Sequence, residues 1–154
     1  MKVRIETAED LQEDEIVIKC KKITQSIKKL SETILSGNLA APKITFYKKS
    51  EEHYLPLQEI LFFETSKENV CAHTAADTFK VKFRLYELED ILPHFFVRVS
   101  KSTIINITGV LSIDKNLASA SLVRFQKSYK QVYASRFYYK NLKQRLNERS
   151  HYED

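Results

Sequence analysis

The chain has 154 residues, of which 43% are hydrophobic and 11% aromatic, and its formal net charge is +5. This length is typical of a compact fold with a hydrophobic core, and the composition argues against an intrinsically disordered chain. Two glycines cannot build a glycine-rich phosphate-binding loop, and the two cysteines lack the CxxC spacing of a zinc site.

The basic charge lies mainly in the last third of the chain. Residues 97–154 hold eleven Lys and Arg against four Asp and Glu, whereas residues 1–20 hold three against six. An excess of this kind favours a polyanionic partner, most often a nucleic acid. The alternative is a lysine-rich surface that meets only solvent.

Residues 1–41 are expected to form a small β-β-α module. Val3 and Ile5 alternate with polar residues, and residues 15–20 are rich in β-branched side chains, so both stretches favour strands around an acidic turn. A helix that Gly37 ends is predicted next, because apolar residues recur at helical spacing: Ile23, Ile27, Leu30 and Ile34. This stripe either packs on the two strands or forms a face for dimerisation or another partner.

Residues 42–150 are expected to form a second, mainly antiparallel β domain, followed by a tail at 151–154. Short β-rich runs separated by polar turns are typical of hairpins rather than of βαβ units. Helices are predicted over 85–92, where Pro93 ends the helix, and over about 137–149. The expected strands are 44–47, 54–57, 60–64, 70–74, 79–83, 110–113, 121–125 and 131–134.

No residue pattern indicates catalysis. The four histidines are scattered, and none has the spacing of a helical metal site. Adjacent carboxylates such as Glu51 and Glu52 are typical of solvated turns, and no nucleophile elbow, Walker loop or kinase signature is found. We therefore expect no enzyme activity, no cofactor, no metal and no small-molecule substrate.

A cation stands beside a hydroxyl at the end of another expected strand. Residues 97–100 (VRVS) alternate apolar and polar side chains, and Lys101 and Ser102 leave this strand at a bend. A flexible cation next to a short hydrogen-bond donor suits a phosphate. The alternative is a solvated Lys101 beside a Ser102 that caps a helical turn over 103–106.

The last predicted helix begins after Ser135, a suitable N-cap. One stripe is apolar (Tyr138, Leu142, Leu146) and a separate stripe is basic (Arg136, Lys140, Lys143). Such a helix can lie along a phosphate backbone, and Arg136 at the strand–helix junction can instead read O6 and N7 of guanine. Basic residues late in a helix also complement the helix dipole.

Aromatic residues near this helix raise a different option, the stacking of bases from RNA or a single strand. Their spacing assigns most of them to a core or an interface instead. The residues are Tyr129, Tyr133, Phe137, Tyr138 and Tyr139.

An ordered set of motifs over residues 43–148 resembles the LytTR DNA-binding domain of bacterial response regulators. The set runs LPLQEILFFETSKENV, a polar hairpin, LYELEDILPHFFVRVSKSTIIN, GVLSID and YASRFYYKNLK. The family typically shows an I-x-Y/F-x-E strand, an L-x-x-L-E-x-x-L helix, an F-x-R-V-H-R-S-x-I-V-N segment and an S-R pair before its final helix. This chain has Ser100 where His is common, Lys101 where Arg is common and Ile105 where Val is common; lysine lacks the bidentate geometry of arginine.

The resemblance implies an elongated, mainly antiparallel β domain that inserts loops into successive major grooves of direct-repeat promoter sites. Arg98 either contacts a phosphate or braces its strand, and Asn106 is expected to tie its loop. We expect the contact segments to converge into one cationic edge. With the basic stripe included, the predicted DNA-contacting residues are Lys67, Asn69, Arg98, Lys101, Ser102, Arg136 and Lys140.

The leading module is too short for a phosphoacceptor receiver domain, so the chain is similar to stand-alone LytTR regulators. The resemblance implies duplex DNA as the partner, two copies on tandem half-sites and, for some such regulators, a small membrane protein as antagonist. No apolar run is long enough to span a membrane and no secretory signal is found, so we expect a cytoplasmic protein. The alternatives are an RNA- or single-strand-binding module and a protein-interaction module that uses the basic C-terminal face.

Overall fold

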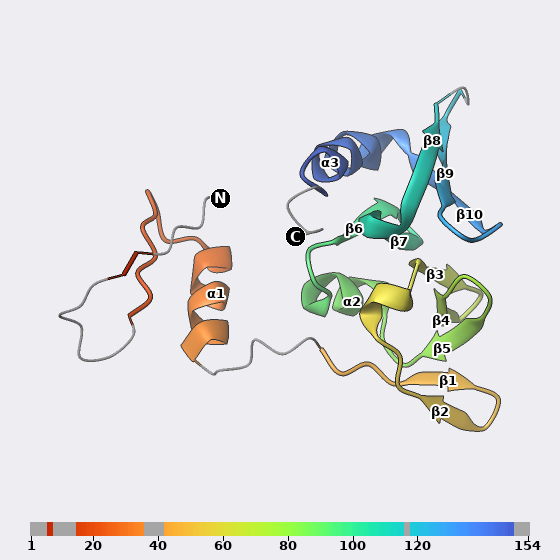
Figure 1. Ribbon diagram of the computed structural model, residues 1–154, viewed down its shortest axis with the longest axis horizontal. Coiled ribbons are helices and arrows are strands. Elements are labelled where there is room, and N and C mark those ends of the chain that lie inside the picture. Colours follow the sequence, from red (N-terminus) through yellow and green to blue (C-terminus); the bar gives the residue numbers. More distant parts are fainter. Residues whose placement is uncertain (1–5, 8–14, 36–41, 116–117, 150–154) are drawn as a thin grey trace. The chain divides into compact units, whose positions relative to one another are not determined.

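The computed structural model describes residues 6–7, 15–35, 42–115 and 118–149. The chain divides into two compact units, Met1–Ala40 and Ala41–Asp154, and each is described by itself (Figure 1). Within the described ranges, no helix combines the length and apolar character needed to cross a membrane.

Helix α1 (Gln25–Leu35) is the regular element of the described part of the first unit. Its start is set by Thr24, whose hydroxyl accepts a hydrogen bond of 3.3 Å from the backbone N–H of Ile27. The predicted stripe is only partly helical, because Ile23 precedes the helix and is 67% exposed. The other three stripe residues are half-buried: Ile27, Leu30 and Ile34.

The strand expected over residues 15–20 is not formed. This stretch has no strand hydrogen bonding, and the side chains of Ile16 and Val17 are 66% and 63% exposed. Branched side chains favour extended backbone, but a strand also needs a neighbouring strand, and none of the described residues supplies one. Val3, Ile5, the acidic turn and Gly37 lie outside the described residues.

Two antiparallel sheets form the second unit. The larger sheet has the strand order β2-β1-β5-β4-β3-β7-β6, and the smaller has the order β10-β9-β8. The strands of the larger sheet are β1 (Phe46–Lys48), β2 (Glu51–His53), β3 (Phe62–Ser66), β4 (Asn69–His73), β5 (Thr78–Val81), β6 (Phe96–Ser100) and β7 (Thr103–Asn106). Those of the smaller sheet are β8 (Val110–Asp114), β9 (Ala120–Phe125) and β10 (Gln131–Ser135).

Short helices connect these strands. They are α2 (Leu85–Ile91), α3 (Arg136–Asn147) and the 3-10 turns η1 (Leu57–Glu59) and η2 (Ile107–Gly109). The mainly antiparallel β fold with short helices that the sequence predicts for this unit is therefore confirmed.

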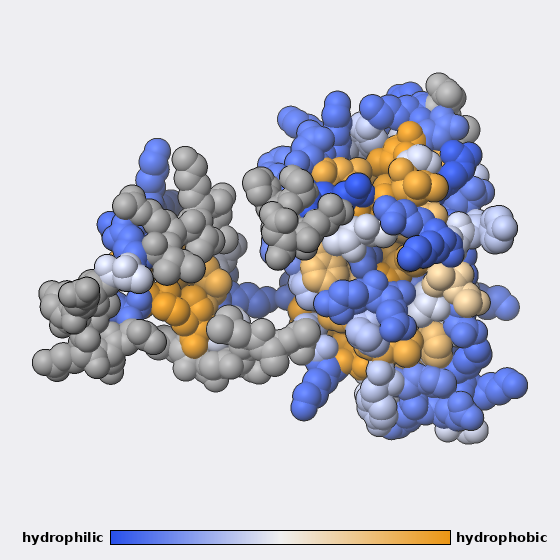
Figure 2. All heavy atoms as spheres, in the orientation of Figure 1, coloured by the Kyte–Doolittle hydropathy of each residue, from blue (hydrophilic) through white to orange (hydrophobic). Residues whose placement is uncertain are grey.

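Alternation along the strands sends side chains into two hydrophobic clusters. On β3, Phe63 packs in one cluster with Leu88 of α2, and Phe62 packs in the other with Leu142 of α3 and residues of the smaller sheet. The larger sheet thus carries α2 on one face and the smaller sheet with α3 on the other (Figure 1). Figure 2 shows hydrophilic side chains over most of the visible surface of this unit, with hydrophobic patches between them.

Two stretches differ from expectation. Residues 54–57 are not a strand but lead into η1, because Pro56 has no N–H to give to a sheet ladder and β2 forms earlier, at Glu51–His53. Residues 103–106 are not a capped helical turn but strand β7, whose four side chains are all buried. This strand pairs with both β3 and β6, and two ladders stabilise it more than one local cap would stabilise a turn.

Candidate nucleic-acid interface

The turn between β3 and β4 presents Lys67 to solvent. Ser66 pairs with Asn69 across the hairpin, so only Lys67 and Glu68 form the turn. Lys67 has φ 55°, in the left-handed region that residues other than glycine enter mainly in tight turns. Both predicted contact residues here, Lys67 and Asn69, are exposed.

Lys67 and Asn69 line an open cleft of about 820 Å³ together with cations from other elements. Lys82 and Arg84 enter it from the β5–α2 connection, and Arg98 enters from β6. The lining residues thus include four cations and a single carboxylate, that of Glu68. An excess of positive charge in a cleft concentrates anions, and it suits phosphates.

Lys82 and Arg84 are not among the contact residues that the sequence predicts. Lys82 lies in the segment 79–83, for which the sequence predicts only a strand, and Arg84 follows that segment. Val81 is buried, while Lys82 and Arg84 are exposed. Strand alternation indicates this exposure in the sequence, because it places both cations on the solvent-exposed face, opposite Val81. The Nζ of Lys82 lies 4.3 Å from the ring centroid of Tyr47, a cation–π contact.

Arg98 braces the β6–β7 turn. Its Nε donates a 2.7 Å hydrogen bond to the carbonyl oxygen of Ser100, and another guanidinium nitrogen donates to the carbonyl oxygen of Lys101. A third donates at 2.8 Å to a carboxylate oxygen of Glu89 on α2, and the Arg98 side chain is only 17% exposed. These contacts fit the bracing role that the sequence left open, and they hold Lys101 at an exposed turn.

The β6–β7 turn is joined to β3. The carbonyl oxygen of Ser102 accepts a 2.9 Å hydrogen bond from the backbone N–H of Thr65, which is two residues before Lys67. Within the turn, the hydroxyl of Ser100 accepts from the backbone N–H of Ser102 at 3.2 Å. The turns that carry Lys67 and Lys101 therefore lie at the same end of the larger sheet.

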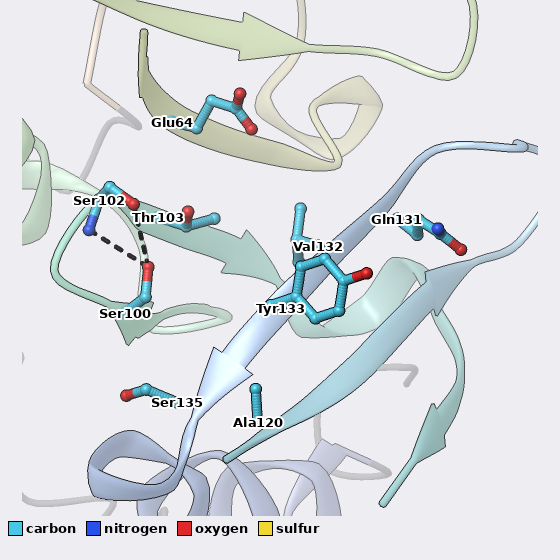
Figure 3. A pocket seen from close by; sticks show the side chains of 9 residues that line it. All are labelled: Glu64, Ser100, Ser102, Thr103, Ala120, Gln131, Val132, Tyr133 and Ser135. Carbon is cyan, nitrogen blue, oxygen red and sulfur yellow. Dashed lines mark hydrogen bonds between the residues drawn. The ribbon is translucent and has the colours of Figure 1, made fainter. Parts of the chain in front are cut away.

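A second cleft, of about 340 Å³, brings the β6–β7 turn to the junction of β10 and α3. Figure 3 shows Ser100 and Ser102 on one side of this cleft, and Tyr133 and Ser135 of β10 on the other. Its remaining lining residues are Glu64, Thr103, Ala120, Gln131 and Val132. Because Arg136 directly follows Ser135, the segments around 67, 101 and 136 are brought together.

The first turn of α3 is exposed and cationic. Ser135 occupies the N-cap position, but its hydroxyl makes no capping hydrogen bond. Arg136 is exposed and donates one guanidinium hydrogen bond to the carbonyl oxygen of Ala118. Lys140 is exposed one turn later, while Leu142 is fully buried. We call the exposed set Lys67, Lys82, Arg84, Lys101, Arg136 and Lys140 the cationic edge.

The aromatic residues near α3 are more exposed than the sequence predicts. Tyr129 and Phe137 are 106% and 85% exposed, and Tyr133 is 57% exposed, so these three side chains are not in the core, whereas an interface stays a prediction. Tyr138 and Tyr139 are half-buried. Periodicity identified Leu142 as the core side of the helix, but it gave no measure of how far the remaining aromatic side chains reach into solvent.

Asn106 ties its loop, as expected. Its side chain is almost fully buried, and its amide nitrogen donates a 3.0 Å hydrogen bond to the carbonyl oxygen of Ile60. Its side-chain oxygen accepts from the backbone N–H of Thr108 at 3.0 Å and from the Thr108 hydroxyl at 2.6 Å. This network joins the end of β7 to the chain before β3.

A separate set of contacts joins the two sheets at the β4–β5 turn. The Nζ of Lys130 donates a 2.6 Å hydrogen bond to the carbonyl oxygen of Asp77, and the Ser128 hydroxyl donates at 3.2 Å to that of Ala75. His73 stacks on Phe62 with 4.2 Å between ring centroids. Burial, and secondarily the charge of Lys130, lowers the pKa of His73 to about 4, so the ring is neutral at pH 7.

An antiparallel β domain that gathers cations from several turns at one edge belongs to the class of nucleic-acid-binding domains. The family of the LytTr DNA-binding domain matches residues 50–147. The chain belongs to this family.

Relatives and a solved structure agree with this assignment. The chain is 39% identical over 103 residues to an uncharacterized HTH-type transcriptional regulator of Staphylococcus aureus strain NCTC 8325, covering 66% of this chain and 68% of the relative. A relative of the same description from strain MRSA252 is 38% identical over the same length and the same shares of both chains. The fold matches the LytTr DNA-binding domain of a putative methyl-accepting/DNA response regulator from Bacillus cereus, with TM-score 0.63, 20% identity and coverage of 68% of this chain and 97% of that domain.

The names of the staphylococcal relatives specify a helix-turn-helix, which needs two helices joined by a short turn. In the second unit of this chain, over residues 42–115 and 118–149, five strands separate α2 from α3. These two helices therefore do not form that motif, and the turns remain the elements that carry the candidate contacts.

Proposed function

We propose that this protein is a transcriptional regulator that binds duplex DNA sequence-specifically through its cationic edge. The observation that carries the proposal is the convergence of three segments far apart in the chain, those of Lys67, Lys101 and Arg136. The Thr65–Ser102 hydrogen bond links the first two, and the cleft that Ser102 and Ser135 share links the second to the third.

In the proposed mechanism, exposed lysines of the edge neutralise phosphates and fix the register of the domain on the duplex. Arg98 holds the β6–β7 turn in place, with its guanidinium committed to three protein oxygens. Arg136 keeps further donors beyond its bond to Ala118, and it reads a guanine in the major groove. The neighbouring turns enter successive major grooves.

The regulator acts in the cytoplasm as two copies on a direct repeat. Its activity is antagonised by a small membrane protein, as the family resemblance implies. These parts of the proposal rest on family resemblance, whereas the contact surface rests on the turns described above.

Selection of bound duplexes from a random DNA pool tests the proposal. We expect enrichment of one motif that occurs twice in the same orientation, with centres one helical turn of about 10–10.5 base pairs, or a multiple of it, apart. Enrichment of no motif, or of a single unrepeated one, would contradict sequence-specific binding to direct repeats.

A second candidate function is favoured by the exposure of Tyr129, Tyr133 and Phe137, because exposed aromatic rings stack on unpaired bases. Competition between the selected duplex, each of its separated strands and the matching RNA distinguishes the two functions. Duplex DNA should displace the protein from labelled duplex at the lowest concentration. Preferential displacement by a single strand would support the second candidate.

A further inference from the structure

Phe137 is a large apolar side chain in an unusual place. It lies in the first turn of α3 and is 85% exposed. Among the described residues, its ring contacts that of Tyr138 edge to face, with 5.0 Å between centroids. The core contacts of the helix are made by a different face, where Leu142 is fully buried. Packing among the described residues of the second unit, 42–115 and 118–149, therefore does not account for a phenylalanine at this position.

The surroundings of Phe137 are cationic and polar. Arg136 precedes it, and Lys140 lies three residues later on the same side of the helix; both are exposed. Ser135, on the other side of Arg136, lines the cleft shared with Ser102. A phosphate gains nothing from an apolar ring, so Phe137 suits a different, apolar part of the ligand that the neighbouring cations contact.

We propose that Phe137 contacts the 5-methyl group of a thymine in the major groove, next to the base that Arg136 reads. The thymine methyl is the apolar group that a duplex presents in this groove, and phenylalanine is one of the side chains that contact it. The first residues of a helix are well placed to reach base edges when its N-terminus faces the groove. This inference rests on the proposed function, and it adds a thymine requirement to the recognised sequence.

The experiment uses the full chain and a duplex selected by the wild-type protein. Each thymine is replaced in turn by deoxyuridine, which keeps the base pair and removes only the methyl group. We expect at least one replacement to weaken wild-type binding about fourfold, the effect of leaving one methyl group unburied. Phe137→Ala should bind the thymine and deoxyuridine forms of that duplex equally, and Phe137→Leu should keep part of the difference.

Tyr129→Ala is the matched control. Tyr129 is an exposed aromatic residue like Phe137, but it lies at the other end of β10 from Ser135, beside the contact of Ser128 with Ala75. This variant should discriminate thymine from deoxyuridine as the wild type does. Urea unfolding of Phe137→Ala should match that of the wild type, because the removed ring is exposed.

Three results would overturn the inference while leaving the proposed function intact. In one, no deoxyuridine replacement weakens the wild type; in another, Phe137→Ala retains the wild-type discrimination. An equal loss of affinity of Phe137→Ala for every duplex would likewise overturn the inference, since this result would show that Phe137 contacts DNA without discriminating between bases. If the selection enriches no duplex, the proposed function fails and the thymine contact fails with it.

Discussion

The backbone N–H of Thr65 donates a 2.9 Å hydrogen bond to the carbonyl oxygen of Ser102. This bond lies one residue beyond the last paired position of β3 and β7, where Glu64 faces Thr103. The main chain thus holds the turn of Lys67 to the turn of Lys101 without help from either side chain. A fixed spacing between two cations suits a ligand whose phosphates are themselves regularly spaced.

Replacing Arg98 with lysine should destabilise the fold rather than weaken phosphate contacts. Lysine keeps the charge but cannot reproduce the forked contacts to Ser100, Lys101 and Glu89, so we expect the free energy of unfolding to fall by about 1–2 kcal/mol. Glu89→Gln, which removes only the exposed ion pair, should cost less than about 1 kcal/mol. Urea unfolding measures both. Unchanged stability with uniformly weaker DNA binding would assign Arg98 to a phosphate instead.

The salt dependence of DNA affinity should identify the phosphate contacts. Lys67→Ala and Lys101→Ala should each make the log–log slope less steep by about 0.9, the value for one neutralised phosphate. Lys49→Ala is a close control, because Lys49 has φ 56° in a hairpin turn as Lys67 has φ 55°. The strand register places Lys49 at the opposite end of the larger sheet. An equal change in all three variants would disprove a localised edge.

Arg136→Ala should reduce affinity for the selected duplex by about 1–3 kcal/mol and relax the preference at one base pair, if this side chain reads a guanine. Arg136→Lys keeps the charge without the bidentate geometry, so it should restore general affinity but not the preference. Titrations against duplexes that vary at each position measure both effects. Equal weakening on every duplex would reassign Arg136 to a phosphate.

The sequence was most informative where local patterning and packing agree. Alternation in β3 and β10 and the apolar stripe around Leu142 correspond to buried faces, so those elements were predicted close to their observed bounds. The sequence was less informative where pairing with a distant strand decides which secondary structure a segment adopts. The alternative of a helical turn over 103–106 depends only on Ser102 as a cap. The local pattern cannot show that β7 pairs both with β6, which directly precedes it, and with β3, which is far away in the chain.

The candidate site also combines residues that the sequence pattern locates with residues that only the fold brings together. The motif order located the turns of Lys67, Lys101 and Arg136, but it did not supply Lys82 and Arg84, which join the cleft only because β5 lies next to β4. Nor could spacing establish that Phe137 is 85% exposed. Exposure depends on the neighbours that the fold brings in, and these are not encoded in the local pattern of one helix.

Acid should weaken the second unit through His73. Its pKa is about 4 in the folded protein, below the ordinary value of 6.5, so between these values the unfolded chain binds more protons than the folded one. The contribution of neutral His73 to the free energy of unfolding is therefore fully present above about pH 6.5, and it is lost as the pH falls towards 4. After allowance for solvent screening, we expect a loss on the order of 1–2 kcal/mol.

His73→Gln should flatten the dependence of stability on pH in that window, and urea unfolding at several pH values measures the difference from the wild type. The comparison isolates His73 from His94, whose pKa is also lowered, chiefly by burial. Parallel curves for the wild type and His73→Gln would show that this ring does not titrate on unfolding.

The last prediction concerns dimerisation through the first unit. Ile23 is 67% exposed and precedes α1, whereas Ile27 is half-buried within the helix. If this apolar side of the unit is a self-association face, Ile23→Asp should weaken the dimer at least tenfold with the helical circular dichroism unchanged, because an exposed charge at an interface is desolvated when two copies meet. Sedimentation velocity measures the dimer. If Ile23→Asp leaves association intact and Ile27→Asp only unfolds the chain without first yielding soluble monomer, the stripe serves the core alone.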